Sequence, residues 1–160
     1  GTWRHVGKTA VLIRIHKEMK RRKLSVGTIK HIGGRSTFDF KDKDTGKHIQ
    51  AGSAVTLALT SSEIVTIRRD PSITLDVAVS QMPKELDYIL VEGFRQSKYP
   101  KIIVVSSESE YPQEVQGDTI AVVINEREIR KGGQTAKAER FSGRTLVDTI
   151  EDYFSSSKVA

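Results

Sequence analysis

Apolar side chains recur at helical spacing in three stretches of the chain. The first stretch predicts an amphipathic helix over residues 8–22, and the third predicts a helix that Ser142 caps. In the second, Asp70-Pro71 predicts a helix cap followed by proline in the first turn. The apolar positions of the three helices are Val11, Leu12, Ile15 and Met19, then Leu75, Ala78, Val79 and Met82, and finally Leu146, Val147, Ile150 and Phe154. The second stretch also fits a strand, because its apolar residues alternate between Ile73 and Val79.

Shorter apolar or β-branched runs between these helices predict the strands of an α/β fold. Three runs are nearly continuous, as in the buried strands of a parallel sheet, and cover residues 86–91, 101–105 and 119–124. A further short run covers residues 25–30. Two runs that flank Thr60-Ser61-Ser62 predict a β-hairpin, with strands over residues 54–59 and 63–68. The β-α-β order predicts an open, mostly parallel sheet that is covered by helices and extended by the hairpin.

The composition indicates one globular domain over residues 1–160. The chain is 37% apolar, which is enough to bury a core, and it contains no cysteine. The absence of cysteine excludes disulfides and thiolate chemistry and suits a cytoplasmic protein. No apolar run approaches the roughly 18 residues of a membrane span, so we expect no membrane partner. The net charge of +6 favours anionic partners. Because the chain begins at a loop glycine without methionine, we expect that an upstream strand is missing.

Gly7-Lys8-Thr9 opens the first predicted helix and resembles the end of a phosphate-binding loop. Such a loop needs backbone N–H groups around the phosphates, a lysine on the outer phosphates and a hydroxyl on Mg²⁺. Lys8 and Thr9 supply the last two, and the positive end of the helix faces the anion. The spacing is irregular, because five residues rather than four separate Gly1 from Gly7. A helix that begins by chance with these three residues is the alternative interpretation.

Acidic residues at the predicted strand ends are candidate metal ligands. Ligands of open α/β sheets bind at the carboxyl ends of the strands, and one buried strand ends in Glu92-Gly93. In a phosphate-loop protein this acid holds Mg²⁺ or its water, and the glycine lets the backbone approach the phosphate. An acid that merely ends a strand is the alternative. Asp39 and Asp44 lie in an acidic segment that could also coordinate a metal, although alternating Asp and Lys residues more often form a solvated loop.

Asn125 and Glu128 directly follow the predicted strand over residues 119–124 and are candidates for reading a guanine base. Guanine is usually read by an asparagine and by a carboxylate three residues on, which accepts from the N1 and N2 donors of the base. Here Glu128 takes the place of the usual aspartate. An exposed charged turn explains the same residues and is the stronger interpretation.

Together these segments resemble the molybdopterin-guanine dinucleotide biosynthesis protein B family, MobB, in family order over about residues 1–105. The most specific matches are the strand end with Lys30-His31 and the block from Asp87 through Val91-Glu92-Gly93-Phe94 to Tyr99-Pro100-Lys101. The remaining matches are Gly7-Lys8-Thr9, Asp39, Lys43-Asp44-Thr45, His48, Ala51-Gly52 and Arg68-Arg69. The chain departs from the family in the irregular loop before Gly7 and at Asp42, where the family usually has glycine.

The resemblance implies a phosphate-loop NTPase that forms a homodimer, binds GTP with Mg²⁺ and hydrolyses GTP weakly. It further implies a role in assisting the MobA-type guanylyltransferase that joins GMP to molybdopterin. By resemblance, residues 7–9 hold the GTP phosphates and the metal, and Glu92 acts on the metal side, with Asp39 and Asp44 as weaker candidates. Lys30 and His31 face the same crevice, where they meet the γ-phosphate or the anionic molybdopterin.

Two other functions fit parts of the sequence. A small-molecule kinase uses the same loop and Mg²⁺, and the arginines within residues 126–140 imitate a kinase lid. A basic nucleic-acid-binding module fits the net charge, but aromatic residues make up only 6% of the chain and no recognised binding motif is present. We therefore rank nucleic acid last among the partners.

Overall fold

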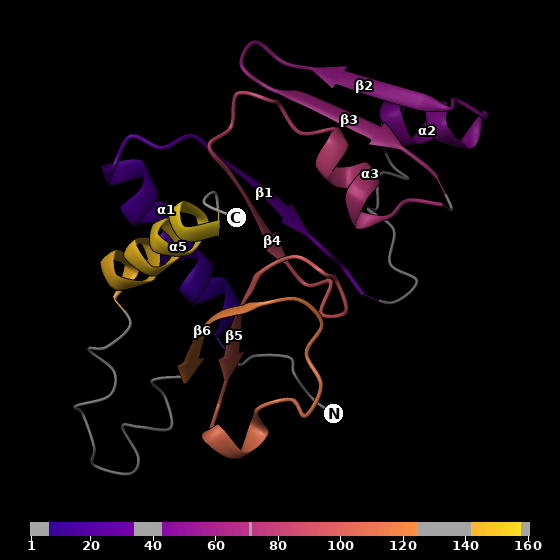
Figure 1. Ribbon diagram of the computed structural model, residues 1–160. Helices are drawn as coiled ribbons and strands as arrows, with labels where there is room; N and C mark the ends of the chain where they lie inside the picture. Colours follow the sequence, from indigo (N-terminus) through magenta and orange to yellow (C-terminus); the bar gives the residue numbers. More distant parts are fainter. Residues whose placement is uncertain (1–6, 34–42, 71, 125–141, 158–160) are drawn as a thin grey trace. The chain divides into compact units, whose positions relative to one another are not determined.

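The computed structural model describes residues 7–33, 43–70, 72–124 and 142–157, which belong to two compact units (Figure 1). Unit 1 comprises residues 1–31 and 79–160, and unit 2 comprises residues 32–78. The helices are α1 (Lys8–Arg21), α2 (Asp44–Gln50), α3 (Leu75–Ser80) and α5 (Gly143–Ser157), with a 3-10 helix η1 (Glu108–Glu110). The strands are β1 (Val26–Lys30), β2 (Val55–Leu59), β3 (Ile64–Arg68), β4 (Tyr88–Glu92), β5 (Lys101–Val105) and β6 (Thr119–Ile124).

Helix α1 confirms the first predicted helix and opens unit 1. Its apolar stripe is buried at Val11, Ile15 and Met19, as the 3.6-residue period requires. Gly7 precedes the helix with a φ of 86°, and its carbonyl accepts a hydrogen bond from the Val11 N–H at 3.0 Å. Gly7 has no side chain to cap the helix, and the first turn contains no acidic residue. The positive end of the helix dipole is therefore left for another anion.

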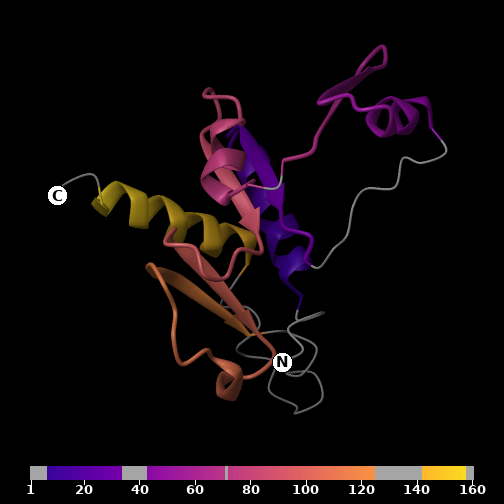
Figure 2. The same ribbon diagram turned by 90° about the vertical axis from the view of Figure 1, so that its right-hand side faces the viewer.

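Four strands of unit 1 form two parallel pairs, β1 with β4 and β5 with β6 (Figure 2). In the first pair Val26 lies opposite Tyr88 and Lys30 opposite Glu92, so both strands end at the same level. Parallel pairing of nearly continuous apolar strands was predicted and is confirmed. The predicted sheet is found only in part, because in the described portion of the chain no hydrogen-bonded ladder joins the two pairs.

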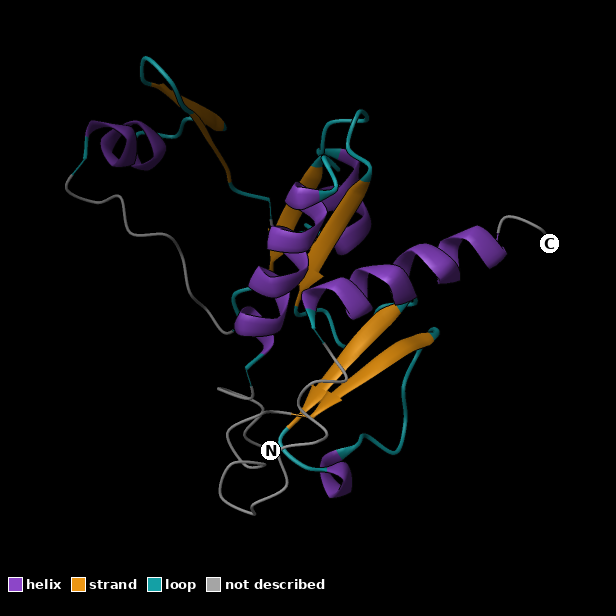
Figure 3. Ribbon diagram, turned by 90° about the vertical axis from the view of Figure 1, so that its left-hand side faces the viewer, coloured by secondary structure: helices purple, strands orange, loops and turns teal. Residues whose placement is uncertain are grey.

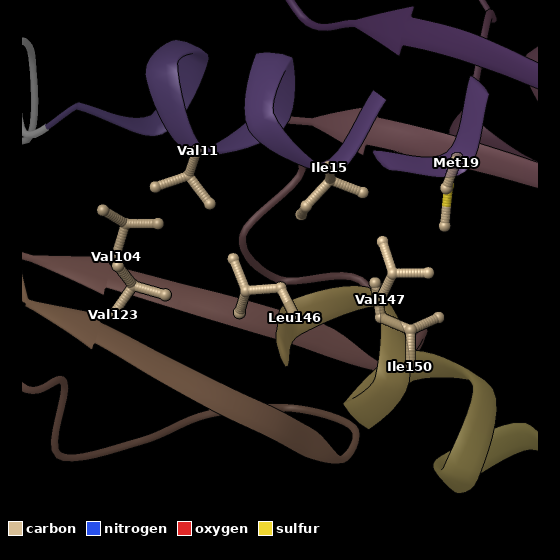
Figure 4. Packing of buried hydrophobic residues seen from close by; sticks show 8 residues of the cluster. All are labelled: Val11, Ile15, Met19, Val104, Val123, Leu146, Val147 and Ile150. Atoms are coloured by element: carbon tan, nitrogen blue, oxygen red, sulfur yellow. The ribbon is translucent and has the colours of Figure 1, made fainter. Parts of the chain in front are cut away.

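The core of unit 1 lies between its two long helices and the strand pairs (Figure 4). Met19 and Val147 are fully covered, and Leu146 is 1% exposed. Partly buried side chains from both strand pairs pack against the same core. The cluster consists of Val11, Ile15, Met19, Val104, Val123, Leu146, Val147 and Ile150. Both strand pairs are therefore held by one set of helical side chains.

Helix α5 begins as predicted, since the Thr145 N–H donates to Ser142 Oγ at 3.2 Å. It packs against α1 and lies beside β6 (Figure 3). At the end of α1, Arg22 donates to Asp148 and to Glu151 of α5, each at 2.5 Å, and to Glu18 at 2.9 Å. This network fixes the end of α1 to α5.

Unit 2 contains α2 and the predicted hairpin, which is confirmed as an antiparallel pair of β2 and β3. The two strands pair with each other and form a separate two-stranded sheet. Thr56 of β2 and Ile49 of α2 are buried, and the two elements are in contact. On the other face of β2, Val55, Leu57 and Leu59 are exposed. The hairpin therefore covers one of its faces with α2.

The predicted helix start at Asp70-Pro71 is wrong, because α3 begins at Leu75. Thr74 is the residue that caps it, since Thr74 Oγ1 accepts a hydrogen bond from the Val77 N–H at 3.2 Å. The Asp70 carboxylate instead accepts from the N–H and the hydroxyl of Ser72, at 3.0 and 2.6 Å, and from Arg68. Such a local turn competes with a helix cap, which explains the later start.

Candidate functional site

The sequence-predicted residues of unit 1 come together where α1 begins and where β1 and β4 end. Gly7, Lys8 and Thr9 form the start of the helix. Lys30 ends β1 and Glu92 ends β4, and the parallel register places these two residues directly opposite each other. The carboxyl ends of parallel strands and the amino end of the helix thus meet, as in ligand sites of open α/β sheets.

The Thr9 hydroxyl and the Glu92 carboxylate are in direct contact. Thr9 Oγ1 donates to Glu92, with its distances to Oε1 and Oε2 at 3.1 and 3.3 Å. The side chain of Glu92 is 16% exposed, so it is sheltered but open on one side. A hydroxyl and a carboxylate, both oxygen donors, therefore lie together at the positive end of a helix.

Lys30 brings a positive charge to the same carboxylate. Its Nζ lies 3.4 Å from Glu92 Oε2, and its side chain is 56% exposed. An ion pair this exposed contributes little to stability, typically about 0–1 kcal/mol. Lys30 is therefore free to turn toward an anionic ligand at small energetic cost.

His31 is held against the turn that follows β4. Its backbone N–H donates to the Glu92 carbonyl at 2.8 Å, and its ring stacks on Phe94 with ring centroids 4.5 Å apart. Gly93 has a φ of 107°, and a Cβ added there would lie 2.6 Å from the Cβ of His31. Glycine is thus required here both by the backbone and by the closeness of His31. Sequence reasoning assigned no role to the Phe94 ring, although its place after the strand-ending glycine was visible.

This arrangement fits a phosphate ester that carries Mg²⁺. The amino end of α1 attracts phosphate, and the exposed Lys8 adds a positive charge beside it. Thr9 and Glu92 offer the hard oxygen ligands that Mg²⁺ prefers. The Glu92 carboxylate accepts from the Thr9 hydroxyl and pairs with the Lys30 ammonium group. Its negative charge is thus available to a cation at this site.

The sequence predicts four further site residues, Asp39, Asp44, Asn125 and Glu128. Asp44 belongs to unit 2, where it begins α2, is 87% exposed and pairs with Lys47 at 3.0 Å. Asp39, Asn125 and Glu128 lie outside the described residues. Over the ranges that the structure describes, no cluster of three or more His, Asp or Glu side chains could hold a metal ion. Among the described residues of unit 1, Thr9 and Glu92 are the oxygen donors in contact at this site.

Comparison with known proteins identifies the family. Residues 2–126 match the family model described as MobB, molybdopterin guanine dinucleotide synthesis protein B. The chain is 30% identical over 122 residues to the molybdopterin-guanine dinucleotide biosynthesis adapter protein of Haemophilus influenzae, covering 74% of this chain and 68% of that protein. It is 27% identical over 125 residues to the probable adapter protein of Bacillus subtilis, covering 76% of this chain and 72% of that protein.

The fold agrees with this result. Among the described helices, none is long and apolar enough to cross a membrane. The crystal structure of Bacillus subtilis MobB is similar with a TM-score of 0.62 and 25% identity, covering 75% of this chain and 74% of that one. The family model, the relatives and this structure together show that the chain belongs to the MobB family of molybdopterin guanine dinucleotide synthesis.

Proposed function

We propose that this MobB-family adapter is a phosphate-loop NTPase that binds GTP with Mg²⁺ at the start of α1. The observation that carries the proposal is the contact of Thr9 with Glu92, at 3.1 Å, beside an uncapped helix start. Gly7 lets the chain turn into the helix, and the first N–H groups of α1 hold the phosphates. Lys8 reaches the outer phosphates as a charged donor.

Thr9 and Glu92 hold Mg²⁺ in this proposal, Thr9 through its hydroxyl and Glu92 directly or through a water. When bound, the ion neutralises phosphate charge and fixes the orientation of the triphosphate. Because Gly93 has no side chain, the backbone of the turn after Glu92 can come close to the phosphates. Asp39 and Asp44 are further candidates for the metal side, and the contact of Asp44 with Lys47 is weak enough to exchange.

The base and the second ligand have their own candidate residues. Asn125 and Glu128 read guanine, which gives the site a preference for GTP over ATP. Lys30 and His31 lie beside Glu92 and offer a cation and a ring to an anionic ligand, either the γ-phosphate or molybdopterin. Molybdopterin thereby meets the nucleotide at one edge of the sheet, as an adapter in molybdopterin-guanine dinucleotide biosynthesis requires.

We further propose that the adapter works in the cytoplasm as a homodimer and meets a MobA-type guanylyltransferase. An exposed apolar face of the hairpin supports the dimer: Val55, Leu57, Leu59 and Ile64 are 50, 55, 67 and 69% exposed. Leu59 lies opposite Ile64, so these side chains share one face of the sheet. Large exposed apolar patches mark interaction sites, and a two-fold dimer is the commonest way to cover one.

Calorimetric titration with GTP, ATP and GDP, each with Mg²⁺, tests the proposal. The protein should bind GTP more tightly than ATP, and removing Mg²⁺ should weaken GTP binding. The Thr9→Ala variant should lose affinity chiefly when Mg²⁺ is present. The proposal is rejected if a chain extended at its amino end binds none of the three nucleotides.

A further inference from the structure

Lys101, at the start of β5, is part of the Tyr99-Pro100-Lys101 match and has no role in the proposed binding of GTP. Its ammonium group donates to three backbone carbonyls, at 3.2 Å to Arg95, at 2.6 Å to Ser97 and at short range to Gln116. An ammonium group has three N–H donors, so these carbonyls use all of them. Lys101 is half-buried, and a cage of carbonyl oxygens uses all three N–H donors of its ammonium group.

The cage joins two segments that are far apart in the sequence. Two carbonyls belong to the turn that follows Glu92-Gly93, and the third belongs to the segment before β6. The backbone N–H of Lys101 also donates to the Asp118 carbonyl at 2.8 Å, two residues after Gln116 in the same segment. One side chain thus fixes the turn after β4 to the start of the β5–β6 pair.

The turn that Lys101 holds is the one that carries Phe94. Phe94 has a φ of 49°, which a residue other than glycine adopts only when its surroundings enforce it. Its carbonyl accepts from the Ser97 N–H at 2.9 Å, and Ser97 is itself bound by Lys101. The Phe94 ring stacks on His31, at a centroid distance of 4.5 Å. The contacts therefore run from the ammonium group through the turn to a side chain of the candidate site.

The three hydrogen bonds of this cage depend on the positive charge of Lys101. Burial lowers the pKa of Lys101, so placing an amine here has a cost, which three charge-assisted hydrogen bonds offset. A neutral side chain of the same length would leave three carbonyls without their donor.

We propose that Lys101 is a positioning residue of the nucleotide site: its caged ammonium group sets the turn after Glu92 so that Phe94 holds the ring of His31 in place. Two measurements test this proposal: the NMR signal of the His31 ring, which needs no ligand, and the affinity for GTP. Only the second rests on the proposed binding of GTP.

The test uses the absence of cysteine from the chain. Lys101→Cys, treated with 2-bromoethylamine, regains an ammonium group at nearly the length of lysine, whereas treatment with iodoacetamide gives a neutral amide. The ring C–H signal of His31 in a ¹H–¹³C NMR spectrum reports its stacking on Phe94, and His31→Gln assigns the signal. Lys98→Met is the matched control, because Lys98 is an exposed lysine just before β5.

Lys101→Met and the amide derivative should move the His31 signal toward that of an unstacked ring. They should also weaken GTP binding about tenfold, the change that ~1.4 kcal/mol produces. The aminoethyl derivative should restore both, and Lys98→Met should change neither. An unmoved His31 signal in folded Lys101→Met, or equal behaviour of the two derivatives, would overturn the proposal.

Two further outcomes are separable. If the wild type itself binds no GTP, the proposed function fails, while the His31 signal still decides whether Lys101 positions that ring. If Lys101→Met does not fold, Phe94→Leu removes the ring and keeps the cage. Phe94→Leu must then move the His31 signal and weaken GTP binding, and unchanged values for both would contradict the proposal.

Discussion

Replacing Gly93 by alanine should damage the protein in two separable ways. A residue with a side chain at a φ of 107° is in strained backbone, at a cost of about 1–3 kcal/mol. In addition, the new Cβ would lie 2.6 Å from the Cβ of His31, whereas carbon atoms rest about 3.5–4.0 Å apart. His31 Cβ cannot rotate away, so the ends of β1 and β4 must separate, which costs about 1–3 kcal/mol more, as overpacking does.

Gly52 provides a control for the first of these effects. Its φ is 103°, and a Cβ added there meets no atom within 4 Å. Gly52→Ala should therefore lower the free energy of unfolding by about 1–3 kcal/mol, and Gly93→Ala by about 2–6 kcal/mol. Urea unfolding followed by circular dichroism measures both.

His31→Gly removes the atom that the new Cβ meets, so Gly93→Ala should cost less in that background than in the wild type. The two effects are then separated by a double-mutant cycle. Equal losses for Gly93→Ala and Gly52→Ala, with no coupling to His31→Gly, would refute the reasoning that Gly93 is needed for closeness to His31.

Three other changes test separate parts of the account. Arg21 and Arg22 hold the pKa of Glu18 at about 2, below its ordinary value, so the stabilisation by ionised Glu18 is present above the ordinary carboxyl pKa and is lost as the pH falls toward 2. The melting temperature of Glu18→Gln should therefore fall less steeply between about pH 5 and 2 than that of the wild type. Equal slopes would contradict this. Light scattering should show a mass near twice 17.8 kDa, which Ile64→Glu reduces to that of one chain without loss of GTP binding; a dimer that survives the change places the interface elsewhere. Glu128→Ala should abolish the GTP-over-ATP preference at a cost of about 1–3 kcal/mol, and an unchanged affinity ratio removes Glu128 from the site.

Local pattern was sufficient to predict most helices and strands of the fold. The period of Val11, Ile15 and Met19 is a property of one helix and its buried face, so it could be read without any partner. The hairpin and the parallel character of the apolar strands were predictable for the same reason. The meeting of Thr9 with Glu92 also followed from the sequence, because a strand-ending acid and a helix start share one edge of an α/β sheet.

Features that depend on competing contacts were not predictable. Asp70 has the right side chain for a helix cap, yet it binds Ser72 and Arg68, and Thr74 caps α3 instead. The carbonyl cage of Lys101 was also invisible, because backbone oxygens carry no sequence signal. Its position next to a proline gave no indication that its charge is directed inward.

The most direct test of the central claim is the GTP affinity of Lys8→Ala, measured by calorimetry with Mg²⁺ present. Lys17→Ala is the matched control, because Lys17 is an exposed lysine on the same helix, beyond its first turn. If the start of α1 holds the triphosphate, Lys8→Ala should lose on the order of 2 kcal/mol of binding free energy, roughly thirtyfold in affinity, and Lys17→Ala should bind like the wild type. Equal GTP affinity for the wild type and Lys8→Ala would contradict the account.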